Sequence, residues 1–331
     1  MKVLQGFTDV DLQGAGSVVS IGNFDGVHIG HQAVIGSAVQ SGLEKGLMSV
    51  VCTFDPHTRV FLQPDAPPRL LETFDQRLRA IAALGVDIVV VIPFSKMVAE
   101  FPRDNFINEF LVGSLGTVEL HVSEGFTFGA GGAGDVEYLK KVAPGNGFNV
   151  RVVGPVMAGS RAVSSTRLRD AIAKGRVSDA TELLGRPFVL VGEVVTGRGR
   201  GRGLNAPTAN LDVENIFVPG NGVYVTEARL GGGSYKAVSN IGTRPTFGPS
   251  GKLTVETHLL DCEIELYGEQ LELAFLERLR DEIKFESTDA LATQIAEDVR
   301  QASNYVAISN ENVRYTADVS SEVRAGKESS A

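Results

Sequence analysis

Two of the five histidines in the chain lie three residues apart, at the point where a strand is expected to lead into a helix. His28 and His31 follow an apolar run, Val18 to Ile21, and a turn rich in glycine, and residues 32–39 then have helical spacing. Backbone N–H groups at a helix start attract phosphate, Gly30 leaves room for a close approach, and two imidazoles there donate to one phosphate from the same side. The alternative is that one histidine caps the turn and the other packs in the core, and these residues alone leave it open.

A second segment also places groups that bind phosphate at a helix start. The run Val163-Ser164-Ser165-Thr166-Arg167-Leu168-Arg169 precedes a helical stretch, Asp170 to Lys174. Hydroxyl side chains are favoured at helix N-termini, and guanidinium groups add positive charge there. This segment is therefore a second candidate for binding an anion.

The first half of the chain alternates between strand-like and helix-like segments. Strands are expected at 17–21, 49–54, 87–93, 117–122 and 148–153, and helices at 32–40, 74–84, 103–112 and 136–142. This alternation predicts an α/β domain with a doubly wound, Rossmann-like parallel sheet. Ligands of such sheets bind at the carboxyl ends of strands, and both candidate phosphate segments follow such ends.

The pattern changes at Leu183-Leu184-Gly185-Arg186-Pro187. Short strand-like runs with frequent turn residues follow at 188–195, 222–230, 235–241, 253–260 and 270–278, which predicts a small antiparallel β-barrel. An amphipathic helix is expected from Ser287 or Thr288 to about Ala307. We therefore expect a domain at 1–186, a second domain at 187–309 and a flexible polar tail at 310–331.

Composition is that of an ordinary globular protein with 331 residues, 43% hydrophobic and 21% charged. The net charge of −9 argues against general nucleic-acid binding but permits a local basic pocket. The first 14 residues lack the pattern of an export signal, and no apolar run approaches the ~18 residues of a membrane helix, so no membrane association is expected. Cys52 and Cys262 are the only cysteines, which favours the reducing cytoplasm and suggests neither disulfides nor zinc.

The H-x-G-H and S-S-T-x-x-R segments together resemble the nucleotidyltransferase superfamily of adenylate-transferring enzymes. Further motifs, in the same order along the chain, narrow the resemblance to the bacterial bifunctional riboflavin kinase/FAD synthetase family. They are Gly22 to His31, Thr53 to His57, Phe126 to Gly129, Pro207 to Asn210, Asn240 to Gly248 and Thr254 to His258. The resemblance covers residues from about 15 to 305.

This resemblance implies an N-terminal module that makes FAD and pyrophosphate from FMN and ATP. His28, His31 and Arg169 would stabilise charge on the transferring phosphorus and the departing pyrophosphate. The nucleotide-binding residues that it implies are Gly22, Phe24, Asp25, Gly30, Ser164, Ser165 and Thr166. Mg²⁺ would serve this step and the following one.

The resemblance also implies a C-terminal module that phosphorylates riboflavin with ATP. Glu256 would be the general base for the 5′-hydroxyl, Thr208 would bind Mg²⁺, and Asn210 would help to hold the metal and the phosphates. A flap over the phosphates would contain Gly197, Gly199, Gly201 and Gly203. The partners would thus be riboflavin, FMN, FAD and ATP, with no nucleic acid.

Plainer interpretations exist for several of these residues. Glu256 alternates with apolar neighbours and would also suit a solvated strand face, and Pro207 to Asn210 would also suit a simple proline turn. The arginines between the flap glycines resemble an RNA-binding repeat, although the total charge disfavours that reading. Two further functional classes are an enzyme with one active module and a binding protein without catalysis.

Three positions depart from the family pattern. Gly125 replaces the usual Asn or Asp before Phe-x-Phe-Gly, which removes a polar contact expected near the flavin or the nucleotide. Asn205 and Ala206 replace the usual Gly and Phe before Pro207. Asn also adopts the left-handed conformation that Gly favours, whereas Ala206 lacks an apolar side chain. We expect altered flavin affinity in the first module and a looser flap in the second.

Overall fold

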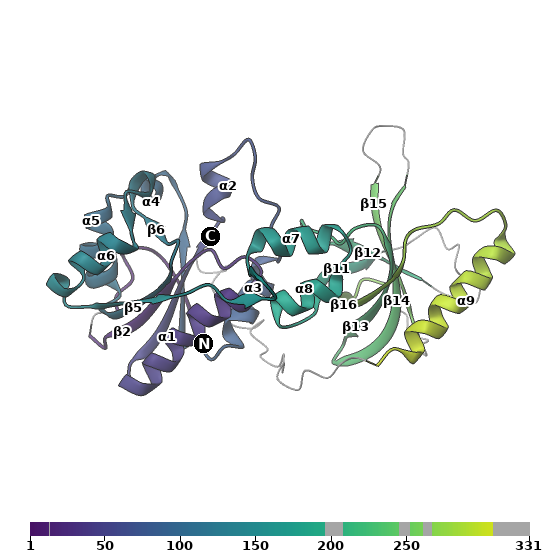
Figure 1. Cartoon of the computed structure of the whole chain (residues 1–331), viewed down its shortest axis with the longest axis horizontal. Coiled ribbons are helices and arrows are strands. Elements are labelled where there is room, and N and C mark those ends of the chain that lie inside the picture. The colour runs from purple at the N-terminus through teal and green to yellow at the C-terminus, as the bar shows by residue number, and fades with distance from the viewer. Residues whose placement is uncertain (13, 196–207, 245–251, 261–266, 307–331) are drawn as a thin grey trace. The chain divides into compact units, whose positions relative to one another are not determined.

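The computed structural model describes residues 1–12, 14–195, 208–244, 252–260 and 267–306. The chain forms two compact units (Figure 1), of which the first contains Met1–Arg69 and Phe74–Val163. The second contains Leu70–Thr73 and the described residues from Ser164 onward. The four flap glycines, Asn205, Ala206, Cys262 and the expected tail at 310–331 lie outside the described residues.

The first unit is built on a six-stranded sheet in the order β1-β4-β3-β2-β5-β8, and every neighbouring pair is parallel. The expected doubly wound α/β domain is therefore confirmed. Its strands are β1 Lys2–Gln5, β2 Ser17–Ile21, β3 Met48–Asp55, β4 Ile88–Pro93, β5 Thr117–Ser123 and β8 Asn149–Val153. Strand β1 was not predicted, because its four residues lack a clear alternation of polar and apolar side chains.

Helices follow most strands of the first unit, as the alternation predicts. They are α1 Ile29–Lys45, α2 Thr58–Leu62, α3 Phe74–Ala82, α4 Lys96–Ala99, α5 Arg103–Asn105 and α6 Val136–Val142. The expected helix at 103–112 has a wide π-type stretch at Phe106–Ser114, where Leu115 N–H donates to the Phe110 carbonyl. Short 3₁₀ turns lie at Ala130–Gly132 and Pro144–Asn146, and two-residue strands pair as β6 Thr127–Phe128 with β7 Gly134–Asp135 and as β9 Met157–Ala158 with β10 Arg161–Ala162.

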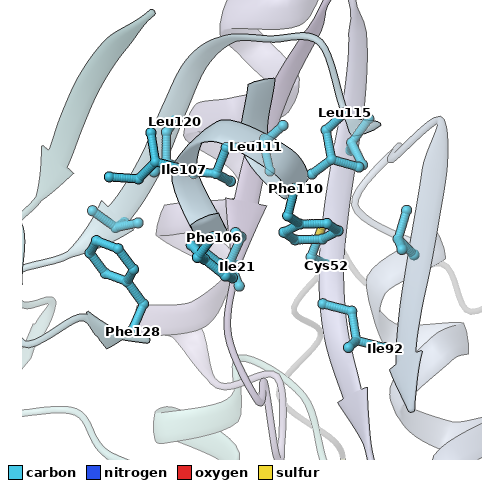
Figure 2. Packing of buried hydrophobic residues seen from close by; sticks show 14 of the residues in the cluster. Ile21, Cys52, Ile92, Phe106, Ile107, Phe110, Leu111, Leu115, Leu120 and Phe128 are labelled. Carbon is cyan, nitrogen blue, oxygen red and sulfur yellow. The ribbon is translucent and has the colours of Figure 1, made fainter. Parts of the chain in front are cut away.

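The two faces of this sheet are covered by different helices. On one face, the π-helical stretch and α6 pack on alternate residues of the strands, including Ile21, Cys52 and Ile92 (Figure 2). On the other face, Ile35 of α1 and Ile81 of α3 pack against the intervening strand residues. Cys52 is a free and fully buried thiol, and burial raises its pKa. It is therefore a residue of the core.

The second unit contains a closed antiparallel barrel, in the order β11-β12-β15-β14-β13-β16 with β16 paired back to β11. Its strands are β11 Phe188–Val195, β12 Ala209–Val213, β13 Gly222–Leu230, β14 Gly233–Arg244, β15 Lys252–Leu259 and β16 Gln270–Arg280. The predicted barrel is confirmed. Strand β12 was not among the strands expected from the sequence. Helices α7 Ser165–Ala173 and α8 Val177–Leu184 precede it, and α9 Thr288–Asn304 follows it.

Alternation along the strands decides which side chains fill the barrel. Val255 and Leu259 are buried with Thr257 between them, while Glu256 and His258 belong to the opposite face of β15. Thr226, Ser239 and Thr257 are fully buried inside, and their hydroxyls hydrogen-bond to one another, with 2.7 Å between Thr226 Oγ1 and Ser239 Oγ. These hydroxyls satisfy each other in the apolar interior.

Two buried ion pairs attach further segments to the second unit. Arg186, which follows α8, pairs with Glu72, and both side chains are about nine-tenths buried. Helix α8 packs against β16 and β11. Arg280 of β16 pairs with Asp298 of α9 through two donors, at 3.0 and 2.7 Å. Bidentate pairs of this kind hold a defined orientation, so α9 has a set position on the barrel.

No helix in the described part of the chain is both long and apolar enough to cross a membrane.

A group of polar residues is buried beneath α1. His121 of β5 is fully buried, with Nδ1 at 3.0 Å from Ser37 Oγ and Nε2 at 3.1 Å from Glu119 Oε1. Lys45 and Ser41 of α1 also donate to Glu119.

The pKa values of both titratable groups in this cluster are lowered. Burial lowers the pKa of His121 and is the largest effect on it. The charge of Glu119 raises this pKa by less than burial lowers it, and the charge of Arg151 lowers it further. Burial would raise the pKa of Glu119, but hydrogen bonds from Lys45 and Ser41 outweigh it and hold that pKa below its usual value. The folded chain therefore favours neutral His121 and ionised Glu119.

We predict that the free energy of unfolding decreases as pH falls from about 7 to about 5, because the unfolded chain then binds protons at His121 that the folded chain excludes. Glu119 contributes in the same direction at lower pH. His121→Gln should weaken this pH dependence, which urea unfolding at pH 7 and pH 5 measures. An equal decrease in the variant and the wild type would contradict the assignment.

Candidate active sites

The loop at residues 22–28 begins at the topological switch point of the sheet. Strand β2 lies between β3 and β5, so the chain after β2 first builds the sheet on one side and later on the other. In doubly wound sheets, the crevice at this point binds ligands at the carboxyl ends of the strands. The loop leads from the carboxyl end of β2 into α1 and carries both candidate histidines.

His28 is the N-cap of α1 and is 5% exposed. Its Nδ1 accepts a hydrogen bond from the His31 backbone N–H at 3.2 Å, so the neutral ring carries its proton on Nε2. The two imidazoles stack with centroids 3.6 Å apart, and Phe24 meets the His31 ring edge-to-face. His28 is thus both a cap and an oriented donor, so the capping alternative holds for this residue without excluding phosphate chemistry.

The backbone of this loop is strained. Phe24 and Val27 have φ of +49° and +36°, a region that side chains other than glycine rarely adopt. Such residues cost about 1–3 kcal/mol each and persist only where the surroundings hold them. Both side chains are buried in the core beneath α1, which is one source of that support. Asp25, between them, is also buried.

Asn23 supplies the other support. Its carbonyl accepts hydrogen bonds from Arg77 Nη1 at 2.9 Å and from Thr53 Oγ1 at 3.2 Å. Its side chain pairs with Thr58, since Nδ2 donates to Oγ1 at 2.9 Å and Oδ1 accepts the backbone N–H at 3.0 Å. Sequence reasoning did not identify Asn23, Arg77 or Thr58, because these partners are up to 54 residues apart.

At two glycines of this segment, Gly22 and Gly30, the surroundings leave little room for a side chain. A Cβ at Gly30 would lie 3.2 Å from Nδ1 and Cε1 of His28, and a Cβ at Gly22 would lie 3.0 Å from the Phe24 ring. Contacts this short would force the neighbouring ring to move. The absence of a side chain at Gly30 therefore leaves the His28 ring in its present position.

An aromatic group lies at the carboxyl ends of β3 and β4. Phe94 meets Phe54 and Phe61 edge-to-face, at 5.6 and 5.7 Å between centroids. Phe61 of α2 is 41% exposed, so this group offers an open aromatic surface near the strand ends. Such a surface suits a planar ring system. The sequence signal that could have found it is the position of Phe54 near the end of β3 and of Phe94 directly after β4.

The S-S-T-x-x-R segment belongs to the second compact unit. Ser164 is the N-cap of α7, where its Oγ accepts from Arg167 N–H at 3.3 Å. Ser165 and Arg169 are four residues apart in α7 and share a helix face, and Thr166 is exposed. Helix α7 thus begins at Ser165, five residues before the expected helical stretch at 170–174, and the hydroxyl side chains lie at its start as predicted. Contact of this segment with a nucleotide stays a prediction.

The candidate residues of the barrel form a row on its outer face. Asn210 of β12 lies opposite Glu256 of β15, and Glu256 lies opposite Asn240 of β14. Directly opposed residues have Cβ atoms about 4.5–5.5 Å apart, so the carboxylate stands between two amides. All three are partly exposed, whereas their neighbours Ala209, Val255 and Ile241 are buried. The structure thus brings Asn210 and Glu256 together as the motifs implied.

Thr208 is exposed, immediately precedes β12 and lies two residues before Asn210. A hydroxyl and an amide oxygen are hard ligands of the kind that Mg²⁺ accepts beside water and phosphate oxygens. Across the described residues, His, Cys, Asp and Glu form no group of three or more able to hold a metal ion. The donors present therefore fit a metal that is bound largely through a phosphate ligand.

Asn240 is a residue that the sequence analysis passed over, although it lies in a quoted motif. Only the register of β14 against β15 places it beside Glu256.

Gly125, where the chain departs from the family pattern, is exposed, and an added Cβ would meet no atom within 4 Å. Space therefore exists for the missing polar side chain, and the departure removes a functional group without a steric reason.

Comparison with known proteins finds one family match in the first half of the chain and another in the second half. Residues 11–167 match the family model of FAD synthetase, and residues 184–306 match that of riboflavin kinase. The bifunctional riboflavin kinase/FMN adenylyltransferase of Pseudomonas fluorescens is 37% identical over 302 residues, which cover 91% of this chain and 97% of that protein. The protein of the same description from Escherichia coli K12 is 36% identical over 307 residues, or 92% and 98% of the two chains.

One solved structure shares the fold over most of the chain. It is described as a macrolide-efflux protein from Streptococcus pneumoniae, with a TM-score of 0.86, 29% identity, and coverage of 92% of this chain and 100% of that one. The alignments with the two sequence relatives cover nearly the whole length of those proteins. The chain therefore belongs to the bifunctional riboflavin kinase/FMN adenylyltransferase family.

Proposed function

We propose that this protein converts riboflavin to FMN and FMN to FAD, using one ATP in each step. The observation that carries this proposal is that each of the two family regions contains an arrangement of residues suited to phosphate chemistry. The arrangements are the histidine loop at the switch point and the Asn210–Glu256 row on the barrel. The alternative, in which only one module is active, is an outcome of the experiment below.

In the adenylation step, a phosphate oxygen of FMN forms a bond to the α-phosphorus of ATP, and the bond to pyrophosphate breaks. The attacking oxygen is already anionic, so the step needs no general base. His28 Nε2–H, His31 and the backbone N–H groups at the start of α1 stabilise the negative charge that builds up on the phosphoryl oxygens. Arg169 and the hydroxyls of Ser164, Ser165 and Thr166 are proposed to act in this step as donors to phosphate oxygens.

In the phosphorylation step, the 5′-hydroxyl of riboflavin attacks the γ-phosphorus of ATP, and ADP leaves. Unlike the FMN phosphate, this hydroxyl must lose a proton, and the Glu256 carboxylate accepts it. The placement of Glu256 on the outer barrel face supports this role, because the side chain is accessible and lies beside Asn210. Positioning and neutralisation of charge supply the remainder of the acceleration.

We propose that Thr208 and Asn210 hold Mg²⁺ together with the phosphates of ATP. The ion supplies positive charge that lowers the barrier to phosphoryl transfer. We further propose domains at 1–186 and 187–309, a division that follows the family matches at 11–167 and 184–306, whereas the compact units of the fold divide at Ser164. We also propose action in the cytoplasm on these small molecules, without nucleic-acid or membrane partners. The open aromatic surface at Phe61 is a candidate for the flavin ring in the first module.

The direct test is incubation of the full chain with riboflavin, ATP and Mg²⁺, followed by chromatographic separation of FMN and FAD. We expect FMN to appear first and FAD to follow. Accumulation of FMN alone would mean that only the barrel module is active, whereas FAD made only from supplied FMN would mean that only the first module is. Absence of both products would contradict the proposal.

We predict that Gly30→Ala lowers the rate of FAD formation from FMN about tenfold, because the new methyl group displaces the His28 donor. Riboflavin phosphorylation should stay within about twofold of the wild type. Gly36→Ala is the matched control, since it lies in the same helix and its added Cβ meets nothing within 4 Å. Equal losses in the two variants would contradict a role for the His28 position.

Glu256→Gln is expected to lower kcat for riboflavin phosphorylation by roughly 10²–10⁴-fold, because it removes the base and keeps the side-chain size. FAD formation from supplied FMN should be unchanged. Glu193→Gln provides a control, because Glu193 is exposed on β11 and outside the Asn210–Glu256 row. Phosphorylation by Glu256→Gln near the wild-type rate would remove Glu256 from the mechanism.

A further inference from the structure

Asn23 connects three parts of the first unit that are distant in sequence. Arg77, from α3, is buried, and its guanidinium donates to the Asn23 carbonyl, as does the hydroxyl of Thr53 at the end of β3. These two bonds hold the backbone of the residue directly before Phe24, where the strained part of the histidine loop begins. The main chain of Asn23 is thus anchored to the sheet and to α3.

The side chain of Asn23 makes a separate, two-bond connection to Thr58. The amide donates to the Thr58 hydroxyl and accepts the Thr58 backbone N–H, so that both polar atoms of the amide are used. Thr58 is the first residue of α2, and His57 caps that helix by accepting from Arg59 N–H at 3.1 Å. The two hydrogen bonds therefore tie the histidine loop to the start of α2.

We propose that Asn23 and Thr58 are a positioning pair that sets the distance between the histidine loop and α2, and thereby between the two substrates of FAD formation. The inference rests on the proposed function of the first unit, in which the loop binds the phosphates of ATP. Helix α2 carries the open aromatic surface at Phe61, which is suited to the flavin ring. One side of the pair thus serves the nucleotide, and the other serves FMN.

This arrangement has a kinetic consequence that separates it from a purely structural role. Loss of the pair leaves the loop attached to Arg77 and Thr53, and leaves Phe61 attached to Phe94. Each substrate retains its own contacts, but the alignment of the FMN phosphate with the α-phosphorus is lost. KM should therefore change little, and kcat should fall.

The experiment uses Thr58→Val in the full chain, with Thr58→Ser as the matched control. Valine has the size of threonine but lacks the hydroxyl, whereas serine retains it. For FAD formation from FMN and ATP, we expect Thr58→Val to lower kcat about tenfold and to change either KM by less than about threefold. Thr58→Ser should remain within about twofold of the wild type, and riboflavin phosphorylation should be unchanged in both variants.

A double-mutant cycle tests whether the two residues act together. Asn23→Ala should lower kcat for FAD formation at least as much as Thr58→Val, and adding Thr58→Val to Asn23→Ala should cause no further loss beyond about twofold. Unchanged kcat in Thr58→Val, equal losses in Thr58→Ser, or a parallel loss of riboflavin phosphorylation would each overturn the positioning role. Failure of the wild type to make FAD would overturn the proposed function of this unit, and the inference with it.

Discussion

The hydrogen bond from the His31 backbone N–H to Nδ1 of His28 links the chemistry of the first unit to its fold. It starts α1, because it satisfies one of the N–H groups that a helix leaves without an internal partner. It also selects the ring nitrogen that carries the proton, and so directs a donor away from the helix. The loop that leads to this bond contains the strained residues Phe24 and Val27, which the core and the bonds to Asn23 support. Stability and chemistry are therefore not separable at this loop.

A different constraint governs the barrel, namely the register of its strands. Glu256 is outside and Thr257 inside because neighbouring residues of a strand face opposite ways. A shift of one residue would bring the Glu256 carboxylate into an apolar interior and turn the hydroxyls of Thr226, Ser239 and Thr257 away from one another. Burial of an unpaired carboxylate is costly, so the same register that closes the core also exposes the row of Asn210, Glu256 and Asn240.

The sequence predicts the parts of this structure that depend on local pattern. Strands β2, β11 and β13 and helix α6 lie at the expected residues, because alternation, apolar runs and turn residues mark them. Helix α1 begins at Ile29, three residues before the expected start, since apolar spacing does not reveal a histidine cap. Strand β12 has five residues and a mixed pattern, and it is held by its pairing with β11 and β15.

The contacts at the candidate sites that the sequence did not predict are contacts between residues distant along the chain. The motifs named His28, His31, Asn210 and Glu256, but they did not indicate that Asn23 binds Thr58 or that Asn240 faces Glu256. The first pair spans 35 residues and depends on the parallel pairing of β2 with β3, after which Asn23 and Thr58 follow. The second depends on the β14–β15 register. Neither relation has a periodic signal, because both arise only when separate elements pack together.

The histidine loop and the Asn210–Glu256 row present different chemical groups, and the proposed nucleophile at each differs in the same respect. FMN attacks through a phosphate oxygen that is already ionised, so a site at a helix N-terminus with imidazole donors needs only to stabilise charge. Riboflavin attacks through an alcohol, which must transfer its proton, so the barrel presents a carboxylate on its outer face. A helix N-terminus would stabilise that carboxylate and weaken it as a base, whereas the strand places it between two neutral amides. In the proposed mechanism, the acidity of the attacking group thus accounts for a histidine loop in one unit and a glutamate on a strand in the other.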